Sequence, residues 1–246
     1  MRPVAALFFD LDRTLLDDSQ YPESVVNTCK VISDRYLHLN FIDLQQAHRA
    51  MWLDYGAPSI DKWIAGSLSG HSLYREMWRR TLAICNIDDD ATIDCATQAH
   101  LGFSRDSYQL FDDVRSSISA LQKLNIPFAL ITNGAVDTQN EKIRAVEIEQ
   151  WFDVISISGS TGGAKPNVSA FLPALTKLGV SGKNVWHIGD NLVTDVAGAN
   201  AANITSVWIN RNGAVQTADD PAPDIEVHSL TDLVHLLESE KERGAW

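Results

Sequence analysis

Cysteine is scarce in this sequence and long hydrophobic runs are missing, and each absence excludes a class of protein. The three cysteines, Cys29, Cys85 and Cys95, are an odd number at wide spacings, so they cannot form a disulfide framework or a zinc-binding motif. The apolar run that starts at Val4 meets Asp10 well before it reaches the length of a signal-peptide core or a membrane span. We therefore expect a protein of the reducing cytoplasm that does not enter a membrane.

Basic residues are in the minority, with 20 Lys and Arg against 32 Asp and Glu, which gives a net charge of −12. Because this charge repels polyanions, we expect neither a nucleic-acid groove nor docking on anionic lipid. The chain has no low-complexity linker and no visible repeat. Its 246 residues, 45% of them hydrophobic, are enough to bury at least one full-sized core.

The apolar pattern predicts a strand, then a helical stretch, then an alternation of helices and strands. Val4–Phe9 is a short continuous apolar run, as in a strand that is buried on both faces. Apolar residues then recur at helical spacing, and a helix is expected after the acidic Asp88–Asp90. Beyond Phe111, amphipathic helices alternate with apolar strands, as in a parallel sheet covered by helices. These later strands are expected at residues 126–131, 154–157, 185–188 and 204–209.

The simplest organisation is one Rossmann-like three-layer α/β domain with an all-helical insertion. The α/β domain would comprise residues 1–17 and 106–246, and the helical insertion residues 18–105, because a parallel sheet needs the first strand beside the later ones. Two sequential domains are the alternative. They are less economical, since a lone N-terminal strand would find no partner in the helical stretch.

Polar residues that are costly to bury follow four of the five predicted strands, at the sheet edge where open α/β sheets bind ligands. Taken alone, each has an ordinary explanation, because Asp and Asn often form helix caps and turns and a loop lysine is often solvated. Taken together, four carboxylates would converge at one edge, where a close pair repels by about 4 kcal/mol at roughly 4 Å and an effective dielectric near 20. The four are Asp10, Asp12, Asp190 and Asp195.

A cation must therefore lie among these carboxylates, and oxygen ligands without nearby His or Cys favour Mg²⁺. Lys165 would add a second positive charge, and Thr132, Asn133 and the backbone N–H of Gly134 are suitable donors to phosphate oxygens. The pattern predicts a phosphoryl-transfer site. No glycine-rich Walker loop ending in Lys-Ser or Lys-Thr occurs, so P-loop hydrolysis of nucleotide triphosphates is not indicated.

Four motifs resemble those of the haloacid dehalogenase (HAD) superfamily and occur in the same order along the chain. The helical insertion resembles the C1 cap of that superfamily. The resemblance covers residues of about 4–16 and 106–212, so it implies a HAD-like core with an inserted cap that closes over the site. The motifs are Asp-x-Asp-x-Thr at 10–14, Thr-Asn-Gly at 132–134, Lys165 in its loop, and Gly-Asp-x-x-x-x-Asp at 189–195.

The resemblance implies that Asp10 is the nucleophile that forms an aspartyl-phosphate. It also implies that Asp12 protonates the leaving alcohol and then deprotonates the attacking water. The resemblance further implies that Asp10 and Asp12 are Mg²⁺ ligands. It implies that Asp190 is a direct ligand and that Asp195 acts directly or through water.

For the phosphate itself, the resemblance implies that Thr132 holds the transferring group, supported by Asn133 and Gly134. Lys165 would neutralise charge on Asp10 and on the phosphoryl oxygens. The sequence departs from its relatives at Arg13, where they often have glycine or another acid. This side chain either reaches phosphate or points to solvent.

Asp12 separates reaction classes, because haloacid dehalogenases lack the second acid and do not need Mg²⁺, whereas phosphate-transferring members keep it. We therefore expect a Mg²⁺-dependent phosphomonoesterase that acts on a small phosphorylated metabolite. Residues 189–213 are similar to the branch that contains FMN phosphatases and pyrimidine 5′-nucleotidases, which points to FMN or a nucleoside 5′-monophosphate. The alternatives are a sugar-phosphate mutase or a 2-haloacid dehalogenase on the same scaffold, and a non-catalytic metabolite-binding module.

Two sets of side chains in the helical insertion have more than one interpretation. Arg75 and Arg79 share a helix face that would meet an anionic substrate or simply be solvated. Trp52, Tyr55 and Trp63 would stack on a base or flavin ring, or pack in the core.

Overall fold

The computed structural model describes residues 4–36 and 38–242, and its chain divides into two compact units. The first is built from residues 1–17, 110–133 and 147–246, and the second from residues 18–109 and 134–146. The first unit contains the main sheet, and the second is mostly helical.

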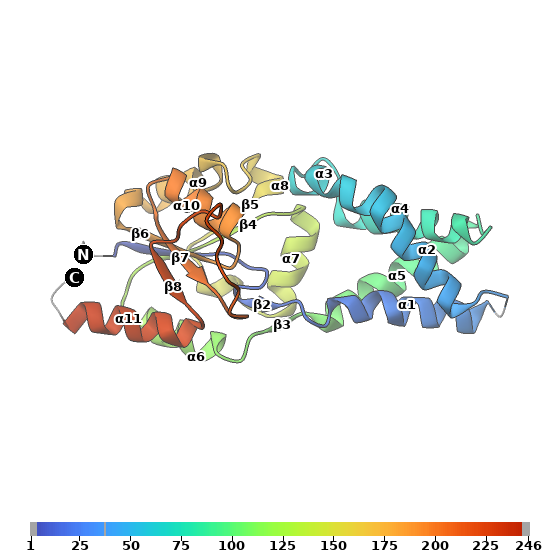
Figure 1. The fold of residues 1–246 in the computed structure, drawn as a ribbon, viewed down its shortest axis with the longest axis horizontal. Helices are drawn as coiled ribbons and strands as arrows, with labels where there is room; N and C mark the ends of the chain where they lie inside the picture. Colours follow the sequence, from blue (N-terminus) through green and yellow to red (C-terminus); the bar gives the residue numbers. More distant parts are fainter. Residues whose placement is uncertain (1–3, 37, 243–246) are drawn as a thin grey trace. The chain divides into compact units, whose positions relative to one another are not determined.

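Six parallel strands form the sheet of the first unit, in the order β5-β4-β1-β6-β7-β8 (Figure 1). The central strand β1 pairs with β4 on one side and with β6 on the other, so that Phe9 is level with Leu130 and Ile188. The predicted parallel α/β architecture is confirmed. The strands are β1 (Ala6–Phe9), β4 (Phe128–Thr132), β5 (Val154–Ile157), β6 (Val185–Gly189), β7 (Thr205–Ile209) and β8 (Ile225–Val227).

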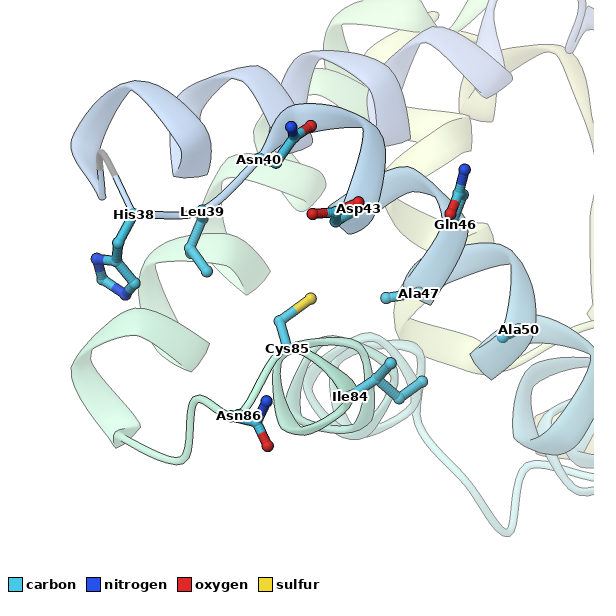
Figure 2. Close-up of a pocket in the computed structure, with 10 residues that line it drawn as sticks. All are labelled: His38, Leu39, Asn40, Asp43, Gln46, Ala47, Ala50, Ile84, Cys85 and Asn86. Atoms are coloured by element: carbon cyan, nitrogen blue, oxygen red, sulfur yellow. The ribbon is translucent and has the colours of Figure 1, made fainter.

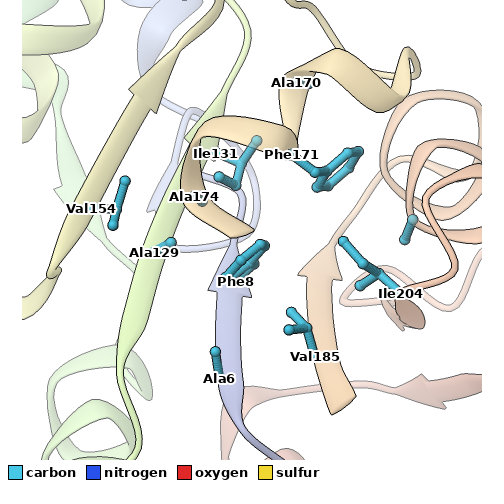
Figure 3. Close-up of a cluster of buried hydrophobic side chains, with 11 residues drawn as sticks. Ala6, Phe8, Ala129, Ile131, Val154, Ala170, Phe171, Ala174, Val185 and Ile204 are labelled. Atoms are coloured by element: carbon cyan, nitrogen blue, oxygen red, sulfur yellow. The ribbon is translucent and has the colours of Figure 1, made fainter. Parts of the chain in front are cut away.

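Helices cover both faces of this sheet, which explains why the central strand β1 is a continuous apolar run. On one face, Phe8 and Ile131 pack with Phe171 in the cluster that Figure 3 shows, beneath α9 (Leu172–Leu178). The helices α6 (Val114–Gln122) and α11 (Leu230–Glu242) lie on the opposite side from α9 and α10 (Ala197–Ala201) (Figure 1). The result is three layers, as predicted.

The second unit is built from helices that begin at polar caps. Asn40 accepts a hydrogen bond from the backbone of Ile42, and Ser69 accepts one from Ser72. Asp89 caps the helix that was expected after the acidic run. The helices are α1 (Tyr21–Arg35), α2 (Phe41–Met51), α3 (Ile60–Ile64), α4 (Gly70–Ile84), α5 (Asp90–Ser107) and α7 (Val136–Ala145).

The arginines of α4 are held by acidic residues of the same unit. Arg75 lies 2.7 Å from Asp90 and 3.0 Å from Asp94, and Arg79 lies 2.7 Å from Glu76. The two guanidinium groups are partly exposed, so this is a solvated face with ion pairs, which was one of the two interpretations. Exposed pairs of this kind contribute little to stability.

All three cysteines are free thiols in the second unit. Figure 2 shows the side chain of Cys85 among the residues that line a cavity of about 480 Å³, formed by α2, the residues just before it and the end of α4. Burial raises the pKa of Cys29 to about 12 and also raises that of Cys85, so both remain protonated and weakly nucleophilic at neutral pH.

Within the ranges 4–36 and 38–242, no helix combines the length and the apolar character that a membrane crossing requires.

Candidate active site

Three predicted site residues lie at the carboxyl ends of adjacent strands, and a fourth lies in the helical turn that follows one of them. Asp10 follows β1, Thr132 ends β4, Asp190 follows β6, and Asp195 lies in the π-helical turn Leu192–Val196. The backbone N–H of Asp10 donates to the carbonyl of Ile188 at 2.9 Å, which ties the end of β1 to β6. Neighbouring parallel strands therefore bring these residues together at one edge of the sheet.

The ammonium group of Lys165 joins two of these carboxylates. Its Nζ donates to Asp10 Oδ1 at 2.5 Å and to Asp195 Oδ1 at 2.6 Å, and all three side chains are buried. The nearby acids raise the pKa of Lys165, although burial alone would lower it. Lys165 is therefore charged at neutral pH.

Asn133 holds the backbone that carries this lysine. Its side-chain Nδ2 donates to the carbonyl of Lys165 at 2.9 Å, and its Oδ1 accepts from the N–H of Lys165, also at 2.9 Å. Both ends of the amide are thus engaged with one residue of a distant loop. This pairing fixes the lysine backbone relative to the end of β4.

His187 is a further site residue, which the sequence analysis did not identify. Its Nε2 lies 2.9 Å from Asp195 Oδ1, and its ring packs edge-on against Phe171 with centroids 5.0 Å apart. Burial lowers the pKa of His187, so the neutral ring donates to the Asp195 carboxylate. A polar ring inside the buried strand Val185–Gly189 was the available signal, since such a group needs a partner.

Oxygens of three carboxylates lie close enough to share one metal ion. In the described part of the chain, ligand atoms of Asp10, Asp190 and Asp195 all lie within 4.8 Å of one another, and Asp12 is not in this group. Asp12 is half-buried, and its charge raises the pKa of Asp10.

The electrostatics of this cluster fit a divalent cation. Burial and the other carboxylates raise the pKa of Asp10, against the lowering effect of Lys165, and burial with Asp195 raises the pKa of Asp190 to about 7. Lys165 and His187 outweigh burial at Asp195 and lower its pKa. Because the negative charges outnumber Lys165, an oxygen-only donor set of this kind suits Mg²⁺.

Arg13 and Gly134 occupy unusual backbone positions beside the site. Arg13 is exposed with a φ of 61°, and its charge opposes the rise in the pKa of Asp190 that burial and Asp195 cause. Gly134 has a φ of 149°, and a Cβ there would come within 2.6 Å of the Trp63 ring. Only glycine fits that turn without displacing the indole.

Gly189 leaves the room that the Asp195 side chain occupies. A Cβ at position 189 would lie 2.2 Å from Asp195 Cγ, so Gly189→Ala must displace this carboxylate from Lys165. We expect the substitution to reduce hydrolytic activity by about 100-fold, because an ångström-scale misplacement can cost that much. The matched variant Gly102→Ala, with no atom within 4 Å of the new Cβ, should keep full activity; equal activity of both variants would contradict the prediction.

Comparison with known proteins identifies the family. The sequence model of haloacid dehalogenase-like hydrolases matches residues 4–203, which include every site residue described above. The chain belongs to this family of hydrolases.

Three relatives illustrate its range. Mouse N-acylneuraminate-9-phosphatase is 38% identical over 53% of the chain and 52% of its own length, so the chain spans about half the length of this relative. The pyrimidine 5′-nucleotidase of Escherichia coli is 25% identical over 94% of the chain and 96% of its own length. The solved 2-haloacid dehalogenase of Pseudomonas syringae is 24% identical with a TM-score of 0.70, covers 96% of the chain and 99% of its own, and shows the shared fold.

Proposed function

We propose that the protein is a Mg²⁺-dependent phosphomonoesterase that acts on a small phosphorylated metabolite through an aspartyl-phosphate. The observation that carries the proposal is the buried bridge from Lys165 to Asp10 and Asp195, with Asp12 two residues beyond the nucleophile. The similarity to an N-acylneuraminate-9-phosphatase and to a pyrimidine 5′-nucleotidase supports this reaction class.

Asp10 and Asp12 carry the chemistry in this proposal. An oxygen of Asp10 forms a bond to phosphorus while the bond to the leaving oxygen breaks, and Asp12 gives that oxygen a proton. In the second half, Asp12 takes a proton from water as the water oxygen attacks phosphorus. The products are free Asp10, inorganic phosphate and the alcohol.

The other residues bind the phosphoryl group or hold the residues that act on it in position. Lys165 neutralises charge on Asp10 and on the phosphoryl oxygens, and Thr132 and the N–H of Gly134 donate to the same oxygens. Asn133 is a positioning residue, because both ends of its amide hold the backbone of Lys165. His187 positions Asp195 in the same way.

Asp10, Asp190 and Asp195 would hold Mg²⁺, with Asp12 adjoining them. The ion supplies charge neutralisation at the phosphoryl group and at the crowded carboxylates. Asp190 has fewer described partners than Asp195, whose oxygens already accept from Lys165, His187 and Asn191. We therefore propose Asp190 as a direct ligand.

Residues 18–105 would serve as the cap that excludes water during the reaction. For the substrate we propose FMN or a nucleoside 5′-monophosphate, which agrees with the similarity to the nucleotidase over 94% of the chain.

The proposal is tested by measuring phosphate release from para-nitrophenyl phosphate and from a panel of phosphorylated metabolites. We expect activity with Mg²⁺, loss of activity in EDTA, and recovery when Mg²⁺ is added back. Absence of release across the whole panel would overturn the proposal. A mutase would instead convert a sugar phosphate into its isomer without free phosphate, and halide release from 2-chloropropionate would indicate a dehalogenase.

A further inference from the structure

An apolar pocket in the second unit is not used by any residue of the proposed chemistry. It has a volume of about 440 Å³ and is lined by side chains of α1, α2, α4 and α5 together with Trp52. The aromatic rings of Tyr21 and Trp52 and the aliphatic Val26 and Met77 contribute to its wall. This size and lining are typical of a site for a small organic molecule.

His48 presents an unused hydrogen-bond acceptor to this pocket. Thr81 Oγ1 donates its one proton to the carbonyl of Met77 at 2.9 Å, so at the 3.2 Å contact with Thr81 the His48 Nδ1 must be the donor. Burial lowers the pKa of His48 to about 4, and the neutral ring therefore leaves Nε2 as an acceptor. His48 is only 6% exposed; its described hydrogen-bond contact is made by Nδ1, and Nε2 is not among the buried unpaired atoms of the described residues.

A second buried imidazole lines the same pocket with a nitrogen that lacks a partner. His100 is fully buried, its Nε2 lies 3.5 Å from the hydroxyl of Tyr21, and no described residue pairs with its Nδ1. Buried polar atoms are nearly always paired in folded proteins. The unpaired His100 nitrogen and the His48 Nε2 acceptor belong to side chains that line one cavity, and this favours a ligand with a hydrogen-bond donor.

Arg49, the neighbour of His48 on α2, adds a positive charge to the pocket lining. Its side chain is exposed, and no carboxylate pairs with it among the described residues. Arg75 and Arg105 of the same unit differ from it, since each lies within 3.0 Å of an acidic side chain. Arg49 is therefore available to an anionic ligand.

We propose that this pocket binds a small aromatic acid that carries a hydroxyl or N–H group. The ring would lie against Tyr21, Trp52 and Met77, the hydroxyl or N–H would donate to His48 Nε2, and the carboxylate would meet the guanidinium of Arg49. A neutral hydrocarbon would satisfy neither polar group, and an inorganic anion would leave the apolar wall uncovered.

The proposal is tested by calorimetric titration with 4-hydroxyphenylacetate at pH 7.5. We expect a Kd below about 1 mM, within what a ligand of this size can reach. Phenylacetate, which lacks the hydroxyl, should bind about 5-fold more weakly, in the range of one lost hydrogen bond. Absence of saturable binding at several times the expected Kd, or equal binding of both compounds, would overturn the proposal.

Three variants connect the binding to the named side chains. Val26→Phe fills the pocket from a half-buried position and should abolish binding of 4-hydroxyphenylacetate. Arg49→Gln should weaken the binding of this compound by about 10-fold. Lys30→Gln removes a positive charge from α1 outside the pocket and should bind like wild type. Wild-type affinity in both pocket variants would contradict the assignment.

His48→Phe keeps an aromatic ring at position 48 without the acceptor. It should bind 4-hydroxyphenylacetate and phenylacetate equally, and a retained preference for the hydroxyl would exclude His48 as its partner. Asp10→Asn should bind as wild type does, so failure of this proposal is distinguishable from failure of the proposed phosphatase activity.

Discussion

Asp10→Asn is expected to lower phosphate release by at least about 10⁴-fold, the scale seen when a nucleophile is removed. Asparagine has nearly the same shape and can still accept from Lys165, so the change removes the proposed attacking oxygen and one negative charge rather than a buried contact. Initial rates of phosphate release with saturating Mg²⁺ measure the effect, and thermal unfolding confirms that the variant is folded.

Two further variants separate the nucleophile from its neighbours. Asp12→Asn should lower the rate of phosphate release by about 10²- to 10⁴-fold, which is the range for general acid–base catalysis. The reason is that the leaving alcohol would no longer receive a proton. Asp43→Asn, at an exposed position on α2, should have wild-type activity. Phosphate release by Asp10→Asn at the wild-type rate would exclude Asp10 as the nucleophile.

The convergence of the site carboxylates was predictable because strand direction alone brings it about. Asp10 and Asp190 each follow an apolar strand, and parallel neighbours end at the same sheet edge. The strand order could be known only from the structure. Which strand lies beside β1 depends on the crossover connections, and no local sequence pattern encodes these. In the structure, β1 lies between β4 and β6.

Other features depend on contacts between residues far apart in the chain. Asn133 and Lys165 are 32 residues apart, so a clamp between an amide and a distant backbone has no local signal. The edge strand Ile225–Val227 is short and contains the exposed Glu226, so it lacks the apolar pattern of the central strands. The helix α2 ends at Met51, after which a π-helical turn leaves Trp52 39% exposed.

The two histidines beside the apolar pocket also bear on the stability of the second unit. His48 stacks on Trp78 with ring centroids 4.8 Å apart, and His100 packs on Tyr74 at 4.7 Å. Burial lowers the pKa of His48 to about 4, and burial with the neighbouring His48 lowers the pKa of His100 to about 3. Neither ring has a carboxylate among its described contacts, so a proton on either one would be a buried, uncompensated charge.

Acid should therefore destabilise the second unit through these two buried histidines. Below the ordinary histidine pKa of 6.5 the unfolded chain binds protons that the folded chain does not, so stability falls as pH falls from 6.5 towards 4. At pH 4.5 the two rings together would lower the free energy of unfolding by about 5 kcal/mol. Hydrogen–deuterium exchange at pH 7.5 and 4.5, corrected for intrinsic rates, should show lost protection in α2 and α5.

The control is His71, a histidine of the same unit whose side chain is exposed rather than buried. His71→Gln should leave the pH dependence of the free energy of unfolding unchanged, whereas His48→Gln should remove about half of it. Urea titration at pH 7.5 must first show that the His48→Gln variant is folded. Peptides from β4 should keep their protection at pH 4.5, since neither histidine packs against that strand. Unchanged protection of α2 and α5 at pH 4.5 would mean that the rings accept protons without cost, and would contradict the burial argument.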